Sequence, residues 1–263
     1  MPKYFTVYKN SLSTYLQYRL NLGLLALSHL VSLSGLVYLW IAVYGSGQTL
    51  GNYTLEQIIF YYIVLSVVQV IIAEGVGTAF EVSDDINQGV ITNYLLKPFN
   101  YSFEQFIKLA GKATINAIFI LPVILLLTLV FGQTAQLPPF IHWLQFVGMM
   151  SIGLIFYFLI YYLAALASFW LTYGKSVIFG TLVISNFLNG GLMPLDTFPD
   201  WFQKINVYSP FKFLMFMPIQ AFLGRIQNWN IILLSSAAWI IIFILIIMYV
   251  WRQGIKRYEA VGR

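Results

Sequence analysis

The residues Tyr173, Gly174, Lys175 and Ser176 match the end of a phosphate-binding loop, whose glycines and lysine surround the phosphates of a nucleotide. A complete loop has another glycine five positions before its last one, and Phe169 stands at that position in this chain. The loop also follows a β-strand, whereas a long apolar run precedes it here. We therefore expect Lys175 to anchor a tight turn and not to bind a nucleotide.

The sequence offers little from which to build a metal site or an active site. His29 and His142 lie in different segments, and neither has a carboxylate at ligand spacing. A zinc site needs three or four converging ligands, and the chain has no cysteine. The serines form no nucleophile motif. We predict no metal site, no cofactor bound by this chain and no catalytic residue within it.

Acidic residues are concentrated in one short segment, EVSDDINQGVITNYLLKPFNY, residues 81–101. The whole chain has nine Asp and Glu among 263 residues, yet Glu81, Asp84 and Asp85 fall within five positions. Long apolar runs lie on both sides of the segment. Its role therefore depends on where a membrane lies relative to it.

The composition is that of an integral membrane protein. Hydrophobic residues make up 60% of the chain and charged residues 9%. A soluble domain is about one quarter charged, so this chain has too few charges to cover a surface in water. The net charge of +5 is explained by basic loops beside a membrane, and we expect no nucleic-acid partner.

Six apolar segments are long enough to be membrane-spanning helices, and together they form a single transmembrane domain over 1–263. A helix needs roughly 20 apolar residues to cross the hydrocarbon layer. The unbroken runs favour an all-α protein over a barrel, whose strands alternate. The predicted spans are 22–44, 55–80, 113–131, 143–170, 177–194 and 231–251.

The distribution of lysine and arginine predicts the orientation. With six spans and both termini in the cytoplasm, eleven of the 14 cations lie inside and only Lys204, Lys212 and Arg225 lie outside. Such an excess of inner cations is typical of membrane proteins. We predict a multi-pass protein of the cell (cytoplasmic or inner) membrane, with 81–101 on the cytoplasmic side and an extracellular segment at 195–230.

Two further segments do not span the membrane in this scheme. The first twenty residues place aromatic side chains at helical spacing and cations beside them, a pattern typical of a helix lying along the cytoplasmic interface. Residues 211–223 are apolar but too short to cross, and Pro218 interrupts them. We expect a short re-entrant segment there, between spans five and six.

A few polar residues fall within the predicted spans. Glu74 is the one carboxylate inside a span, and Asn186 and Asn189 lie in the softer fifth span. Polar groups inside a membrane are costly and are functional candidates. The alternative for Glu74 is that it reaches the interface or pairs with a cation of a loop.

The segment 81–101 predicts a short helix that docks a cytoplasmic partner. Ser83 is a suitable N-cap for a helix over 84–88, Gly89 is suited to end it, and Pro98 stops any second helix.

Within that segment, Val82, Ile86 and Val90 recur at four-residue spacing on one helical face, and we expect this face to enter a groove of the partner. Asp84 and Asp85 lie off this face and are expected to meet basic groups at the rim of the groove. The alternative is a solvated loop.

At this point the sequence resembles the membrane subunits of type-two ABC exporters, in the branch with a separately encoded ATPase. The resemblance rests on the acidic patch Asp84–Asp85, on Gly89 and on the following Leu95-Leu96-Lys97-Pro98. A second match is the segment from Gly190 to Gly224, with its small residues, prolines and short apolar stretch. Both motifs stand in register with six spans.

The resemblance implies the partners and the mechanism. Two six-span subunits, identical or paralogous, form a conduit in the bilayer, and a cytoplasmic ABC ATPase dimer binds ATP and Mg below them. The segment after span two transmits ATP-driven closure, and the outer segment caps the exit. The gate candidates in or near that outer segment are Gly190, Gly191, Pro194, Pro210 and Pro218.

Two other classes of function remain as alternatives. A self-sufficient channel or secondary carrier is expected to show an inverted repeat or several buried ionisable residues. A membrane scaffold or enzyme is expected to show a large surface outside the membrane or a catalytic constellation. The sequence favours the exporter subunit, and its substrate cannot be read from the residues.

Overall fold

The computed structural model describes residues 2–17, 19–51, 53–72, 74–95, 100–131 and 138–260. Within these residues the secondary structure consists of α- and 3-10 helices, with one isolated bridge between Leu50 and Tyr53. The all-α prediction is therefore confirmed for the described part of the chain.

The helices follow the apolar runs of the sequence. The long ones are α2 (Arg19–Gly45), α3 (Leu55–Ile72), α4 (Glu74–Asn87), α6 (Tyr101–Phe131), α7 (Phe140–Ala165) and α11 (Trp229–Ala260). The shorter ones are α1 (Pro2–Gln17), α5 (Ile91–Leu95), α8 (Lys175–Leu188), α9 (Asp200–Asn206) and α10 (Phe216–Phe222). Short 3-10 turns occur at η1 (Leu166–Phe169), η2 (Leu195–Thr197) and η3 (Pro210–Phe213).

Four helical stretches in the described residues are long and apolar enough to cross a membrane. They are Leu27–Gly45, Leu55–Asn87, Phe140–Phe169 and Trp229–Arg257, and they correspond to predicted spans one, two, four and six. The helices α6 and α8 lie where spans three and five are predicted. Because α8 has only 14 residues, it is shorter than an ordinary span, and the count of six remains a prediction.

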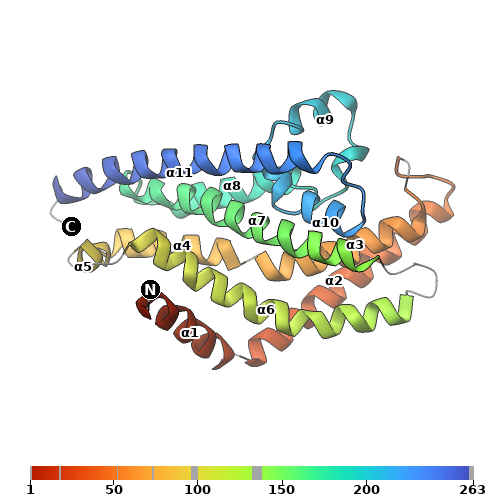
Figure 1. Ribbon diagram of the computed structural model, residues 1–263, viewed down its shortest axis with the longest axis horizontal. Helices are drawn as coiled ribbons and strands as arrows, with labels where there is room; N and C mark the ends of the chain where they lie inside the picture. Colours follow the sequence, from red (N-terminus) through yellow and green to blue (C-terminus); the bar gives the residue numbers. More distant parts are fainter. Residues whose placement is uncertain are drawn as a thin grey trace.

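The long helices run roughly along one axis (Figure 1). The two chain termini lie at one end of the bundle together with α5, whereas the turn between α2 and α3 lies at the other end (Figure 1). This segregation is the arrangement that an even number of crossings requires. We call these the inner and the outer end.

The centre of the bundle is built from α3, α4 and α7, and α10 inserts beside them. In the most apolar stretches of Leu55–Asn87 and Phe140–Phe169, 65% and 72% of the residues are buried, against 12% and 11% for the first and last candidate spans. The peripheral helices α2 and α11 thus turn most of their apolar side chains outward. In a membrane protein the acyl chains of lipids or another subunit cover such faces.

The structure corrects two boundaries that the sequence predicted. Helix α4 runs without a break through Ser83 to Asn87, so the prediction that Ser83 caps a new helix is wrong. Its buried positions, Ala79, Val82 and Ile86, continue at helical spacing and give no reason to stop. Helix α6 begins at Tyr101, well before the predicted start of span three at 113.

Residues 195–230 form a compact cap of short helices. The predicted re-entrant piece 211–223 consists of η3 and α10, joined by a buried Leu214 and Met215. Helix α10 packs against α7 and α3. The cap begins after α8 and ends where α11 starts, and its most exposed element is α9 (Figure 1).

Cysteine accessibility will test the six-span topology. The chain has no cysteine of its own, so single cysteines at Gln48, Gln203, Gln88, Ser176 and Gln253 give no background. Intact cells should label Gln48→Cys and Gln203→Cys with an impermeant maleimide, and the other three only after lysis. Labelling of Gln253→Cys in intact cells would reject the six-span arrangement.

Candidate functional site

The apolar face of α4 is buried within the chain itself. Val82 is 0% exposed and Ile86 is 2% exposed, on a helix that packs against α7, η1 and α8. The expectation that these two side chains enter a partner's groove is therefore wrong, because neighbouring helices already cover them. Their spacing marks the side of α4 that faces the core.

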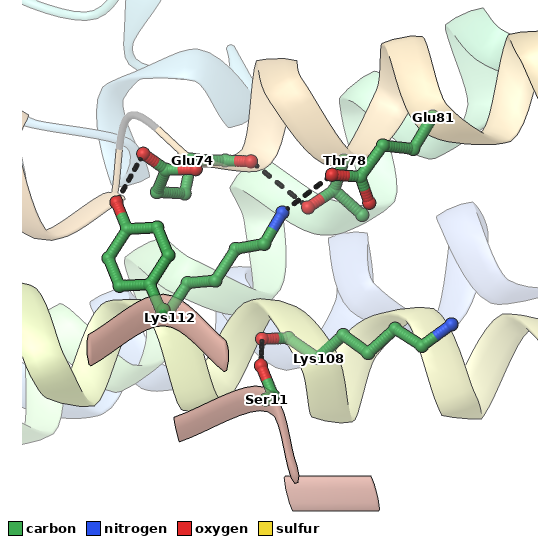
Figure 2. A network of polar contacts seen from close by, with 7 residues as sticks. Ser11, Glu74, Thr78, Glu81, Lys108 and Lys112 are labelled. Carbon is green, nitrogen blue, oxygen red and sulfur yellow. Dashed lines mark hydrogen bonds and ion pairs between the residues drawn. The ribbon is translucent and has the colours of Figure 1, made fainter. Parts of the chain in front are cut away.

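The opposite side of α4 carries carboxylates, and helices distant in sequence contact them. The Tyr15 hydroxyl of α1 donates to Glu74 Oε1 at 2.7 Å. Lys112 Nζ of α6 lies 2.8 Å from Glu81 Oε1 (Figure 2). Glu74 thus meets a hydroxyl of the N-terminal helix, and Glu81 meets a lysine of α6. Among the side chains that the structure describes, the partner of Glu74 is a tyrosine hydroxyl and not a cation of a loop.

The two aspartates are held in the same way. Lys175 Nζ, at the start of α8, lies 2.6 Å from Asp84 Oδ1, and the Tyr101 hydroxyl of α6 donates to Asp85 Oδ2 at 2.6 Å. Both aspartates therefore have partners within the chain. Asp84 keeps 43% of its side chain exposed and remains accessible to another protein.

Gly174 and Lys175 contact neighbouring helices of the chain, Gly174 at η1 and Lys175 at α4. The Ser83 and Ser168 hydroxyls share a hydrogen bond of 2.7 Å, which joins α4 to η1. A Cβ on Gly174 would lie 1.9 Å from the Ser168 oxygen, so only glycine permits this approach. The predicted turn anchor Lys175 then contacts α4 directly through Asp84.

The end of α4 forms the accessible surface of this region. Gly89 has φ +81°, a conformation that favours glycine, and it lies two residues after Asn87, the last residue of α4. On either side of it Gln88, Thr92 and Asn93 are exposed and Val90 is half-buried. Leu96, Lys97 and Pro98 of the family motif lie outside the described residues.

The N-terminal helix α1 is docked on α6. The Tyr8 hydroxyl donates to Thr114 Oγ1 at 3.0 Å. The Ser11 hydroxyl donates to the Lys108 carbonyl at 3.0 Å, as Figure 2 shows. A Cβ on Gly111 would lie 2.8 Å from the Ser11 oxygen, so the glycine allows the two helices to approach. The predicted helix exists, and burial raises the pKa of its Tyr15.

At the outer end, two tyrosines of α3 hold the turn that follows α8. The Tyr61 hydroxyl donates to the Gly190 carbonyl at 2.8 Å, and the Tyr62 hydroxyl donates to the Leu192 carbonyl at 2.6 Å. Gly190 has φ +84°, and a Cβ there would meet the Tyr61 oxygen at 2.9 Å. The Asn189 side chain accepts from the Gly191 amide at 2.7 Å and closes the turn.

Tyr53 connects this turn region to the rest of the cap. Its hydroxyl donates to Asp196 at 2.9 Å and accepts from Gln220 at 3.3 Å. The guanidinium of Arg225 lies 4.4 Å from the centre of its ring, within the range of a cation–π contact. The Tyr44 hydroxyl donates to the backbone carbonyl of Tyr53 at 2.7 Å. One residue thus links α2, η2 and α10.

The predicted prolines line the same cap. Pro194, Pro210 and Pro218 are all buried. A Cβ on Gly153 of α7 would meet the Phe213 carbonyl at 3.0 Å, so this glycine lets the cap backbone lie close to α7. Asn186 does not join the group, because it is exposed on the outer surface of α8.

A comparison with known protein families identifies the family of this chain. A family model described as an ABC-2 family transporter protein matches residues 30–262, which is most of the chain. The chain belongs to the ABC-2 transporter family. No curated protein matches it. Membership identifies it as a transport permease, a multi-pass membrane component that is not itself the catalyst.

Sequence reasoning missed most of the contacts that hold this ABC-2 permease together. The acids of α4 were found, but not their partners Tyr15, Lys112 and Tyr101, because nothing in a single sequence pairs residues far apart. The adjacent pair Tyr61-Tyr62 within a mainly apolar span was the available signal for the outer clamp. A buried tyrosine needs a hydrogen-bond partner.

Two contacts of α4, Tyr101 with Asp85 and Lys112 with Glu81, should contribute differently to the free energy of unfolding. Tyr101 is 4% exposed, so Tyr101→Phe removes a buried donor from Asp85 and should lower the free energy of unfolding by about 1.5–3 kcal/mol. Glu81 keeps 52% of its side chain exposed, so Lys112→Met should cost only about 0–1 kcal/mol. Denaturation of the permease in mixed detergent micelles measures both. Equal costs would contradict this ranking.

The tyrosine clamp of the permease makes a second prediction. Tyr61→Phe keeps the ring but leaves the Gly190 carbonyl without its donor in a buried site, which should cost about 1–3 kcal/mol. Tyr208→Phe is the matched control, because that side chain is 78% exposed and its change should be near neutral. Thermal unfolding in detergent gives the comparison, and an unchanged midpoint for Tyr61→Phe would refute the clamp.

Proposed function

We propose that the protein is the conduit subunit of an ATP-driven exporter, coupled to a separately encoded ABC ATPase dimer that binds ATP and Mg. The observation that carries the proposal is the ABC-2 family match over 30–262, taken together with α4, which extends a central span to the inner end of the bundle. ATP energy is used in the partner, and this chain supplies the path through the membrane.

The docking surface is the exposed tip of α4 and α5. The apolar stripe of α4 is unavailable, so the surface consists of Asp84, Gln88, Val90 and the exposed residues of α5. These side chains are polar or only partly buried, and they lie on the same end as both termini (Figure 1). A surface of this kind suits a partner that binds and releases through polar contacts.

The contacts of α4 supply the route by which a partner acts on the spans. A push on its tip reaches α6 through Tyr101 and Lys112, α8 through Lys175, and α1 through Tyr15. Because these contacts join separate helices to α4, the inner ends of those helices move together with α4. The N-terminal helix takes part in this movement through α6.

The outer cap acts as the exit gate in this proposal. Gly190 and Gly191 form the turn on which the cap pivots, and the buried Pro194, Pro210 and Pro218 keep its segments short and stiff. Tyr61 and Tyr62 hold the turn shut from α3. Since α3 leads directly into α4, the inner docking surface and the outer clamp are on one continuous stretch of chain.

The complete transporter contains a second six-span subunit, identical or paralogous, in the cell membrane, and both termini of each chain face the cytoplasm. The apolar outward faces of α2, α8 and α11 give such a subunit and the lipids room to bind. Transport runs outward. The chemical class of the substrate stays open.

Substitution at the tip of α4 tests the proposal. Gln88→Trp places a bulky side chain on the exposed tip and should abolish co-purification of the ABC ATPase and ATP-dependent export, with the permease still folded. Gln48→Trp is the matched control, since Gln48 is exposed at the outer end, and it should retain both. Full ATP-dependent export by Gln88→Trp would reject the docking surface at the tip of α4. Transport by the purified chain without any ATPase would reject the exporter-subunit function in favour of a channel or carrier.

A further inference from the structure

A cavity of about 380 Å³ lies between α3, α6 and α7, with Phe222 of α10 at one end. It is separate from the carboxylate contacts of α4 and from the hydrogen bonds that Tyr61 and Tyr62 make at the outer end. Among the 14 lining residues that the structure describes, only Thr114 and Ser151 carry a hydroxyl, and the rest are apolar apart from the indole NH of Trp143.

The two hydroxyls are already satisfied by the protein. Thr114 accepts from Tyr8 at 3.0 Å and donates to the Ala110 carbonyl at 2.8 Å. Ser151 donates to the Val147 carbonyl at 2.9 Å. The lining thus leaves few polar groups to bind water, and apolar cavities of this kind stay dry and take up apolar ligands.

The cavity is elongated along the bundle. On α7 its lining runs from Trp143 to Leu154, a length of about 16 Å at 1.5 Å per residue. On α3 it runs from Val64 to Ile71, about 10 Å by the same measure. A narrow apolar space of this length, parallel to membrane-spanning helices, has the shape of an extended hydrocarbon chain.

Small side chains on α6 create the space. Ala110, Ala113 and Ala117 recur at helical spacing on the face that α6 turns to the cavity. Larger residues at these positions would fill it. The walls on the other two helices are bulky, as Phe146 and Met150 show.

The volume of the cavity and the bilayer around the protein together indicate which molecule occupies it. A helix of another subunit is about 10 Å across, so even 10 Å of its length takes up roughly 800 Å³ and does not fit. In a bilayer the bundle is surrounded by acyl chains, which can reach the cavity between its helices. We propose that this cavity binds one acyl chain of a bilayer phospholipid, inserted between α6 and α7 and parallel to them.

Photo-crosslinking with a labelled lipid tests this site. The full-length protein is reconstituted in phosphatidylcholine vesicles that contain phosphatidylcholine with a diazirine within one acyl chain, and adducts are mapped by mass spectrometry. Met150 is 7% exposed and Met248 on α11 is 47% exposed. A bound chain should label Met150 at least as strongly as Met248, despite its low exposure.

Filling the cavity should remove this labelling. With Ala117→Leu the Met150 adduct should fall about tenfold, the loss produced by an overpacking cost of about 1.4 kcal/mol, while the Met248 adduct stays constant. Ala110→Leu is a second filling variant in case the first disturbs folding. Ala237→Leu, on an exposed position of α11, is the matched control and should change neither adduct.

Two results would overturn the site. One is a wild-type protein labelled at Met248 but not at Met150, as expected if a side chain of another subunit fills the cavity. The other is a Met150 adduct that persists in both filling variants. Neither result bears on the ATPase partner, so this inference and the exporter function fail or succeed separately.

Discussion

A carboxylate placed among apolar helices is costly unless donors from the protein meet it, because burial removes water that would otherwise solvate it. Helix α4 carries four carboxylates, and donors from α1, α6 and α8 meet them. These contacts therefore tie three other helices to α4. The face of α4 that carries Val82 and Ile86 is buried against neighbouring helices, so α4 is held on two sides.

At the outer end, buried backbone carbonyls likewise need hydrogen-bond donors from the protein. The turn after α8 exposes carbonyls at Gly190 and Leu192 within the cap, and the hydroxyls of Tyr61 and Tyr62 satisfy them. Glycine is needed at 190 both for its positive φ and for the closeness of the Tyr61 ring oxygen. An α3–α4 stretch that clamps the cap at one end and ties the helices at the other is a mechanical link between the two ends.

The elements of the fold followed from the sequence more readily than its contacts did. Spans one, two, four and six depend only on hydrophobic length, a property of each segment alone, and were therefore predictable. The N-cap at Ser83 was wrong because a local capping preference competes with the continuation of an amphipathic helix, and tertiary burial of Ala79, Val82 and Ile86 decides that competition. The pairings of Glu74, Asp84 and Asp85 join residues up to 91 positions apart, and no local pattern encodes them.

The burial of the α4 stripe also limits how a partner can grip this protein. A groove that captured Ile86 would have gained roughly 1.5–3 kcal/mol from one side chain, and such a contact is slow to release. The accessible tip offers Asp84, Gln88 and Asn93 instead, whose contacts with another protein are each worth about 0–1 kcal/mol at a solvated rim. Binding through several weak polar contacts lets a partner change its grip at each cycle. The strong contacts of α4 are kept inside the chain, where in the proposed exporter they would carry the movement to α1, α6 and α8 without being broken by it.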